Sequence, residues 1–306
     1  MKEKQLNLSL IGLGKMGEGL FKNLKRNNYE VTGFDLDKSK YESLKKEGFK
    51  LADKLEDLID KSNKKQNVVF VSVPCGKPTN DTIKSLLKLL PPKSIIVDTG
   101  NSFYKETLEN NKKAKAKDVY FVDCGTSGGP SGALNGACMM VGAEQAAINV
   151  VGPILKKLCV KNGYLHTGEV GSGHFCKMVH NGIEYGIMQS IAEGFQVLYD
   201  SEYEFDLLAV SKLYNNGSVI RSWLMELMGE VFKNKKELED ISGIVNASGE
   251  GLWTVQTALD QGTPVPAIAS ALFARQTSLK QPDLYANKLL ASLRNKFGGH
   301  SFTKKK

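Results

Sequence analysis

A glycine-rich turn between two apolar segments near the start of the chain restricts the possible folds more than any other feature. Residues 6–11 read Leu-Asn-Leu-Ser-Leu-Ile, which is typical of a buried strand, and a helical pattern then extends to about Asn27. The turn at residues 12–17 has the spacing Gly-x-Gly-x-x-Gly. Its glycines permit a tight turn, close approach of a pyrophosphate, and packing of helix on strand. The sequence therefore predicts a dinucleotide-binding unit.

We expect the residues that bind the cofactor to lie at the ends of successive strands, because these ends form the ligand crevice of a doubly wound sheet. Two further strands are predicted at 67–73 and 94–97. The helix N-terminus after the turn would face the phosphates. The candidate cofactor-binding residues are Gly12, Gly14, Lys15, Met16, Gly17, Val73, Pro74 and Asn101. Asn101 and Ser102 are also compatible with a simple turn and helix cap.

The end of the second predicted strand, at residues 29–34, distinguishes the two nicotinamide cofactors. Asp35 follows this strand, and no arginine comes directly after it. A carboxylate here accepts hydrogen bonds from the ribose hydroxyls and repels a 2′-phosphate. We therefore predict NAD, with NADP as the less favoured cofactor. Asp37 is expected to cap a helix at 38–47.

The pattern of elements changes after residue 168. Strands at 119–123, 139–142 and 162–166 and a helix at 144–158 complete an α/β, mostly parallel, doubly wound sheet of the Rossmann type. Only helical patterns follow, at 171–199, 205–215, 218–232, 251–261, 266–280 and 283–296. We expect a dinucleotide-binding domain at 1–168 and an all-α domain at 169–306.

Consecutive small residues follow the predicted strand at 119–123. They run from Cys124 to Pro130 and include Ser127, Gly128 and Gly129. Exposed backbone N–H groups in such a stretch form a nest that binds a carboxylate. A glycine-rich surface loop is the alternative.

The long helix predicted from residue 171 carries the polar groups best suited to catalysis. Lys177, His180, Asn181 and Glu184 are spaced i, i+3, i+4 and i+7 and share one face. Gly182 within the helix costs ~1 kcal/mol relative to alanine and indicates close packing or a nearby ligand. A solvated face with an ion pair is the alternative. We expect the other side to be buried, through Phe175, Met178, Val179, Ile183 and Ile187.

Composition and charge narrow the function classes. The net charge of +8 arises in part from the final three lysines, and the other lysines are scattered without interleaved aromatic residues, which argues against nucleic-acid binding. No apolar run approaches the ~20 residues of a membrane span, so we expect no membrane partner. A basic chain suits an anionic substrate and cofactor.

The five cysteines are scattered without a Cys-x-x-Cys spacing. This pattern is typical of reduced thiols in the cytoplasm and not of a disulfide framework or a zinc site. Cys176 is adjacent to Lys177, which raises the idea of a nucleophile, but its helix position points it away from the polar face. We therefore expect a cytoplasmic protein without a metal.

The helix at 171–199 closely resembles the catalytic helix of 6-phosphogluconate dehydrogenases. The motif Gly-His-Phe-x-Lys-Met-Val-His-Asn-Gly-Ile-Glu-Tyr-Gly-x-Met-Gln of that family stands at residues 173–189. The wider β-hydroxyacid dehydrogenase superfamily shares only its Lys and Asn. Four shorter matches support the resemblance: Asp-x-Gly-Asn-Ser at 98–102, Ser-Gly-Gly at 127–129, Phe-Ala-Arg at 273–275 and Arg-x-x-Phe-Gly-x-His at 294–300. At this length the chain resembles the short form of the family.

The resemblance implies an activity and a set of site residues. It implies conversion of 6-phosphogluconate to ribulose 5-phosphate and CO2 without a metal, a step of the pentose phosphate pathway or of gluconate utilisation. Lys177, Asn181 and Glu184 would be catalytic. The implied substrate-binding residues are Asn101, Ser127, Gly128, Gly129, His180, Tyr185, Arg275, Arg294 and His300. In this family the tail arginine and histidine reach into the partner subunit's site, which implies a homodimer or homotetramer; a basic, frayed terminus is the alternative.

The chemistry requires a base and an acid that act in turn. Lys177, neutral in a dry site, would take the hydroxyl proton as hydride leaves for NAD, and the β-keto acid then loses CO2. The charged Lys177 would stabilise the enolate oxygen, and Glu184 would protonate the enediol carbon.

One segment departs from the family pattern. Long members carry Lys-Gly-Thr-Gly-Lys-Trp where this chain has a presumed loop, residues 248–254, with Ser248 and Glu250 at the phosphate-binding places. Two alternatives therefore stay open. One is another NAD-dependent β-hydroxyacid dehydrogenase, either non-decarboxylating or acting on an unphosphorylated or sulfonated sugar acid. The other is a nicotinamide-binding sensor without catalysis.

Overall fold

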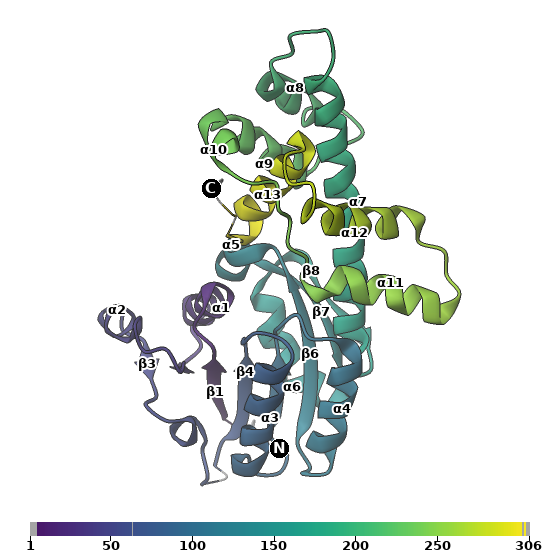
Figure 1. The fold of residues 1–306 in the computed structure, drawn as a ribbon. Helices are drawn as coiled ribbons and strands as arrows, with labels where there is room; N and C mark the ends of the chain where they lie inside the picture. The colour runs from purple at the N-terminus through teal and green to yellow at the C-terminus, as the bar shows by residue number, and fades with distance from the viewer. Residues whose placement is uncertain (1–4, 63, 302, 304–306) are drawn as a thin grey trace. The chain divides into compact units, whose positions relative to one another are not determined.

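The computed structural model describes residues 5–62, 64–301 and 303, and it divides into two compact units, residues 1–178 and 179–306 (Figure 1). Helix α7 (Ser172–Tyr199) begins in the first unit and continues into the second. The change of pattern in the sequence suggested a boundary at 168/169. The structural division falls later because the first turns of α7 pack against the sheet of the first unit, where a Cβ on Gly173 would lie 2.6 Å from the backbone of strand β6.

The first unit is built on a twisted, mostly parallel sheet of eight strands in the described part of the chain. The strands, in spatial order, are β3 (Lys50–Leu51), β2 (Val31–Phe34), β1 (Leu6–Ile11), β4 (Gln66–Val71), β5 (Ile95–Asp98), β6 (Tyr120–Ser127), β7 (Ala137–Ala143) and β8 (Cys159–Gly168). Strands β3 to β6 are parallel, and β7 pairs antiparallel with β6 and parallel with β8. The strand order reverses between β1 and β4, which is where such sheets bind ligands.

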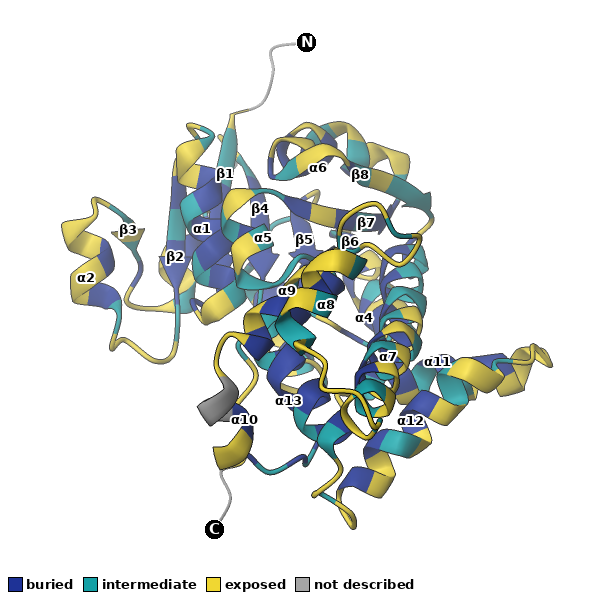
Figure 2. Cartoon of the chain, turned by 90° about the horizontal axis from the view of Figure 1, so that it is seen from above, coloured by how far each residue is buried: buried dark blue, intermediate teal, exposed yellow. Residues whose placement is uncertain are grey.

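Helices cover both faces of this sheet, and the helix sides that face the strands are buried (Figure 2). Side chains that alternate along each strand enter different cores: Val68 and Phe70 of β4 face one, Val69 and Val71 the other. The first core includes residues of α1 (Lys15–Arg26), α5 (Gly129–Asn135) and α6 (Gln145–Lys157). The second includes residues of α3 (Lys77–Leu89) and α4 (Tyr104–Lys115). The short α2 (Tyr41–Lys46) and the 3₁₀ turn η1 (Leu55–Leu58) flank β2 and β3.

The prediction of a Rossmann-type sheet followed by helices is confirmed, with two local corrections in the first unit. The stretch of small residues after 123 is not a loop, because β6 continues to Ser127 and pairs with β7 from Val122 to Ser127. Asp37 does not cap α2, since that helix begins at Tyr41. Its carboxylate instead accepts a hydrogen bond from the Ser39 amide (2.9 Å) in the preceding turn.

The second unit is helical throughout its described residues. Its helices after α7 are α8 (Leu207–Tyr214), α9 (Trp223–Phe232), α10 (Lys235–Asp240), α11 (Gly249–Gln261), α12 (Pro266–Ser278) and α13 (Tyr285–Gly298). A core of α7, α9 and α13 side chains holds it together, with Met188 and Phe195 of α7 buried against Leu289 and Leu293 of α13. Helices α11 and α12 form a neighbouring antiparallel pair (Figure 1). The sequence reading had missed α10.

The buried stripe of α7 differs in part from the one that was predicted. Met178 is buried as expected, but Ile183 is 52% exposed and Ile187 45%, so the expectation that these two are buried is wrong. The helix instead buries Tyr185 and Met188, which continue from Met178 at helical spacing. The apolar pattern misleads here because α7 is apolar on more than one side, and periodicity alone does not tell which side packs.

Two further observations concern the molecule as a whole. No helix in the described part of the chain is long and apolar enough to cross a membrane. None of the five cysteines, all of which the structure describes, takes part in a disulfide.

Candidate active site

The glycine turn after β1 has the shape that a pyrophosphate needs. Gly12 has φ +92°, and a Cβ there would lie 2.3 Å from the Ser72 carbonyl oxygen. A Cβ on Gly17 would lie 1.8 Å from the carbonyl oxygen of Gly12, so both glycines are required by packing. Gly14 differs, because nothing lies within 4 Å of where its Cβ would be. It is also the N-cap of α1, and no side-chain hydrogen bond caps this end of the helix.

Asp35 lies beside this turn, as the sequence suggested. One carboxylate oxygen accepts a hydrogen bond from the Leu13 amide, and the other accepts one from the Asp37 amide at 2.9 Å. The lysines that follow are engaged with carboxylates: Lys40 is 2.6 Å from Glu18, and Lys38 is 3.5 Å from an Asp53 oxygen. The environment of Asp35 is therefore that of a fixed negative charge at the rim of the turn.

Asn101 is held in a turn after β5. Asp98 is buried at the end of that strand and accepts hydrogen bonds from the Gly100 amide (3.0 Å) and the Ser102 hydroxyl (2.7 Å). Ser102 does not cap α4, whose N-cap is Phe103. This arrangement leaves Asn101 exposed at the carboxyl edge of the sheet. Val73, which follows β4, adjoins the glycine turn, since its Cγ1 would lie 3.0 Å from a Cβ on Gly12.

The Ser127-Gly128-Gly129 segment marks the end of β6. Ser127 is the last residue paired with β7, and Gly128 has φ +109°, a left-handed conformation that glycine adopts without strain. Gly129 then opens α5. The segment lies at the same edge as Asn101, because β5 and β6 are parallel neighbours.

Lys177 is fixed against the sheet by two residues of β6, Asp123 and Gly125, that the sequence analysis does not single out. Asp123 in β6 accepts hydrogen bonds from the Gly171 amide (2.7 Å) and the His174 amide (2.8 Å), which anchors the start of α7. Gly125 then receives the lysine stem, because a Cβ on Gly125 would lie 2.3 Å from the Cβ of Lys177. Lys177 is 6% exposed, and Gly125 is two residues before Ser127. Only the glycine spacing in β6 could have signalled this contact.

The next turns of α7 carry the other candidate catalytic groups. Asn181 is 8% exposed, and its side-chain oxygen lies 3.0 Å from Nδ1 of His180. The same ring nitrogen is 4.0 Å from a carboxylate oxygen of Glu184. Lys177, Asn181 and Glu184 follow one another at i, i+4 and i+7 of one continuous helix. The burial of the first two excludes a solvated face.

A cationic cluster lies in the second unit, around Tyr185. The Arg275 guanidinium stacks on the Tyr185 ring, 3.2 Å from its centroid, and Arg275 is only 2% exposed. Burial lowers the pKa of Arg275 to about 10, and the Tyr185, Glu184 and Glu250 side chains oppose that shift. Burial likewise lowers the pKa of Arg294, which is 8% exposed. Two desolvated guanidinium groups are well suited to an anion.

The presumed phosphate loop at 248–254 is not a loop. Ser248 is the N-cap of α11, and residues 249–254 form the first turns of that helix. The Ser248 carbonyl accepts a hydrogen bond from the Tyr185 hydroxyl (3.1 Å). A Cβ on Gly251 would lie 2.4 Å from the Tyr185 ring, so this glycine lets the helix start pack on the ring.

His300 folds back on its own segment. Its ring lies edge-on to Phe297, with centroids 6.1 Å apart, and would lie 2.5 Å from a Cβ on Gly298. Its carbonyl accepts a hydrogen bond from the Asn295 side chain (2.8 Å). The structure thus places Arg294 in the buried cluster of its own chain and the His300 ring against Phe297.

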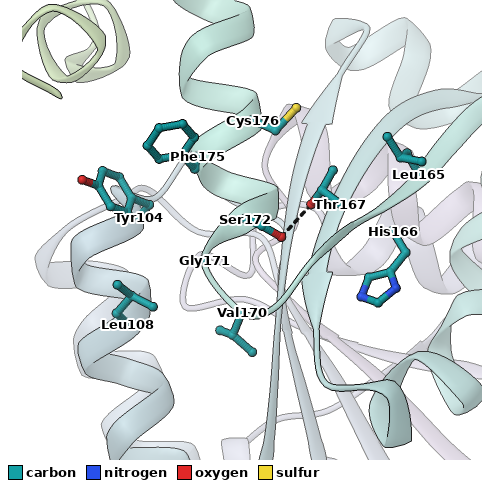
Figure 3. A pocket seen from close by; sticks show the side chains of 10 residues that line it. All are labelled: Tyr104, Leu108, Leu165, His166, Thr167, Val170, Gly171, Ser172, Phe175 and Cys176. Carbon is teal, nitrogen blue, oxygen red and sulfur yellow. Dashed lines mark hydrogen bonds between the residues drawn. The ribbon is translucent and has the colours of Figure 1, made fainter. Parts of the chain in front are cut away.

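A cavity of the first unit contains none of the predicted site residues. It has a volume of about 620 Å³ and lies between α4, the end of β8 and the start of α7 (Figure 3). Its lining is mainly apolar; Tyr104 and Phe175 meet edge to face with ring centroids 5.0 Å apart. The Cys176 thiol borders it, and burial raises the pKa of that thiol, which disfavours a thiolate nucleophile. Over the described residues, no group of three His, Cys, Asp or Glu side chains is placed to hold a metal ion.

Both halves of the chain match known protein families. Residues 7–168 match the NAD-binding domain of 6-phosphogluconate dehydrogenase, and residues 173–306 match the C-terminal domain of that enzyme. YqeC of Bacillus subtilis is 43% identical over 300 residues, which cover 98% of this chain and all of that protein. The NAD(+)-dependent, decarboxylating 6-phosphogluconate dehydrogenase of Haloferax volcanii is 38% identical, over 98% of this chain and 99% of that protein.

Solved structures give the same picture. The 6-phosphogluconate dehydrogenase of Plasmodium falciparum superposes with a TM-score of 0.81 at 30% identity, covering 90% of this chain and 62% of that one. This chain thus spans less than two thirds of the Plasmodium protein. A 3-hydroxyisobutyrate dehydrogenase of Mycobacterium tuberculosis superposes with a TM-score of 0.73 over 95% of this chain and 99% of that one, at 19% identity, which indicates a shared fold.

These matches agree with what the fold and the nucleotide turn indicate by themselves. The class is that of dehydrogenases with a Rossmann-type NAD(P)-binding domain and a helical second domain. Within that class the chain belongs to the 6-phosphogluconate dehydrogenase family. It matches the short relatives from end to end.

Proposed function

We propose that the protein catalyses the NAD-dependent oxidative decarboxylation of 6-phosphogluconate to ribulose 5-phosphate and CO2. The observation that carries this proposal is the placement of Lys177. It is buried and packs on Gly125 of β6. Gly125 lies two residues before Ser127, the last residue of that strand. Lys177 is thus buried at the carboxyl edge of the sheet, where we expect the nucleotide to bind. Asn181 and Glu184 follow it on the same helix. This arrangement supports base and acid chemistry next to a nicotinamide.

The glycine turn fits the cofactor. The open space at Gly14 and the uncapped N-terminus of α1 suit a pyrophosphate, and Asp35 suits the ribose hydroxyls. We assign Lys15, Met16, Val73, Pro74 and Asn101 to the same site from their positions around that turn and edge. NAD held there would supply the hydride acceptor for the substrate carbon that bears the hydroxyl β to the carboxylate.

The protein's residues then move protons in sequence. Lys177 with a neutral amine takes the proton of the β-hydroxyl, which leaves a β-keto acid that loses its carboxylate as CO2. The resulting ammonium of Lys177 stabilises the enolate oxygen. Glu184, carrying a proton, delivers it to the enediol carbon and gives the keto sugar. Asn181 and Ser127 orient the substrate, and His180 lies within 4.0 Å of Glu184, where it can influence that carboxyl.

The phosphate end of the substrate is assigned to the second unit. Arg275 and Arg294 are buried guanidinium groups in one cluster with Tyr185, and such groups bind phosphate in forked geometry. Arg294 acts within its own chain in this proposal. His300 is the tail residue for which a place in a partner subunit's site remains proposed, within a homodimer or homotetramer.

NAD is the preferred cofactor in this proposal. Asp35 is a fixed carboxylate, and Lys40 and Lys38 nearby are held by Glu18 and Asp53. A 2′-phosphate would therefore lie next to the negative charge of Asp35, while both nearby lysines are already paired with carboxylates. The NAD-dependent relative of Haloferax volcanii agrees with this preference. Reduced cysteines support a cytoplasmic enzyme.

The test is an assay of NADH and CO2 with 6-phosphogluconate, gluconate and a sulfonated sugar acid. The proposal expects turnover of 6-phosphogluconate with both products. The second candidate function, oxidation of an unphosphorylated or sulfonated sugar acid, is favoured by one observation, the carboxylate of Glu250 beside the two arginines. NADH formation from gluconate but not from 6-phosphogluconate would establish that alternative.

A further inference from the structure

Glu250 is a buried carboxylate in the cationic cluster of the second unit. It lies in the first turn of α11 and is 4% exposed, while Arg275 is 2% and Arg294 8% exposed. Its charge interacts with both arginines, since Glu250 opposes the burial-induced lowering of each guanidinium pKa. A buried carboxylate is costly unless it is paired and hydrogen-bonded, so this residue requires an explanation.

Tyr185 connects the start of α11 to Arg275. Its hydroxyl donates to the Ser248 carbonyl at 3.1 Å, and the Arg275 guanidinium covers its ring. Gly251 packs on the ring as well, because a Cβ there would lie 2.4 Å from a ring carbon. The residues on both sides of Glu250 are thus fixed against the same ring that Arg275 stacks on.

One buried side-chain atom of Glu250 and one of Arg275 have no hydrogen-bond partner. Oε2 of Glu250 is buried without a hydrogen-bond partner, and so is Nε of Arg275. Buried polar atoms of this kind are rare and call for a missing group. That group has to accept a hydrogen bond from a guanidinium and donate one to a carboxylate.

We propose that this cluster binds the phosphate of the substrate in its singly protonated form, with the P–OH group donating to Glu250 and the other oxygens accepting from Arg275. This proposal rests on the proposed function. With Glu184 carrying a proton, as the proposed function requires, the two guanidinium groups and the Glu250 carboxylate leave a net charge of +1, which a phosphate monoanion neutralises. A dianion has no proton to donate and would set its lone pairs against Oε2.

The cluster has other charged and titratable groups, which any pH experiment must hold constant. Helix α7 contributes Glu184 and Tyr185, with His180 4.0 Å from Glu184. Helix α12 contributes Arg275, and α13 contributes Arg294. Substitution of Glu250 by glutamine leaves all of them in place, so a comparison of the two proteins isolates the carboxylate.

The proposal predicts an unusual dependence of affinity on pH. A phosphate monoester loses its second proton near pH ~6, so wild-type Kd rises by up to about tenfold per pH unit above that value. The amide of Glu250→Gln donates to a dianion. The variant therefore binds 6-phosphogluconate about tenfold or more tightly than wild type at pH 8, with most of the pH slope removed.

The experiment is calorimetric titration of 6-phosphogluconate, without NAD, into wild type, Glu250→Gln and Glu226→Gln between pH 5.5 and 8.5. Glu226 is the matched control, an exposed glutamate in the first turn of α9, and its variant follows wild type. Weaker binding of Glu250→Gln at pH 8, or an unchanged slope, overturns the proposal.

Phosphorus-31 NMR of the bound substrate gives a second test that needs no variant. The proposal expects the bound phosphate to titrate above the free value of ~6, whereas arginines acting alone would lower it. A bound value at or below the free value refutes the role of Glu250. If the wild-type protein binds no 6-phosphogluconate at any pH, the proposed function is overturned as well. If it binds 6-phosphogluconate without the expected pH dependence, only the role of Glu250 is overturned.

Discussion

At the scale of single residues, two side chains at the same sheet edge, a lysine and an aspartate, have the decisive roles. Lys177 is buried on Gly125, and Asp35 is held at the glycine turn by two backbone amides. We assign proton transfer to Lys177 and cofactor selection to Asp35, so a substitution of either side chain tests one role at a time. The two substitutions below distinguish proton transfer from cofactor selection.

Lys177→Ala is expected to reduce NADH formation by about 10²–10⁴-fold, the usual contribution of a general base. NAD binding is expected to be unchanged, because the glycine turn and Asp35 hold the cofactor. Stopped-flow absorbance and calorimetry with NAD measure the two quantities. Lys156→Ala, at an exposed lysine of α6, is the control and retains full activity. Wild-type turnover in Lys177→Ala would remove the base assignment.

Asp35→Asn is expected to lower the ratio of kcat/KM with NAD to kcat/KM with NADP by at least about tenfold, since it removes the charge that repels a 2′-phosphate. The asparagine oxygen still accepts from one of the two amides. Steady-state rates with both cofactors give the ratio. Glu30→Gln, at the opposite end of β2, provides the control for a general change of surface charge. A ratio that stays the same in Asp35→Asn contradicts the electrostatic explanation.

At the scale of the element, α7 determines how the proposed catalytic groups are arranged. Asp123 anchors its first turn, Gly125 receives Lys177, and Gly182 lets α11 approach, since a Cβ there would lie 2.7 Å from the Thr254 methyl group. Gly186, one turn later, has nothing within 4 Å of its Cβ position. The two glycines of one helix therefore form a matched pair.

Gly182→Ala is expected to destabilise the protein by about 1–3 kcal/mol through overpacking against Thr254. Gly186→Ala is expected to be neutral or to stabilise it by up to ~1 kcal/mol, because alanine favours the helix. Urea unfolding followed by circular dichroism measures both. Equal effects of the two substitutions would show that the contact with Thr254 is not tight.

At the scale of the whole molecule, the sheet and the helical second unit, both predicted from the sequence alone, are confirmed, whereas the roles of the residues assigned to the nucleotide edge stay predictions. Predictions from the sequence succeeded where periodicity and glycine spacing reflect local geometry. They failed where packing partners are distant in sequence: Asp123 and Gly125 in β6 position Lys177, and the presumed loop around Glu250 is helical because it packs on Tyr185. The exposed Ile183 shows the same limit, since an apolar side of a helix does not reveal what covers it.

The central claim is that one site performs both the oxidation and the loss of the carboxylate. The most direct measurement follows 6-phosphogluconate labelled with carbon-13 at its carboxylate, incubated with NAD and the protein, by carbon-13 NMR. The account predicts that the label leaves as CO2 in a one-to-one ratio with NADH, and that unlabelled ribulose 5-phosphate remains. Label retained in an oxidised six-carbon product, or no NADH at all, would contradict it.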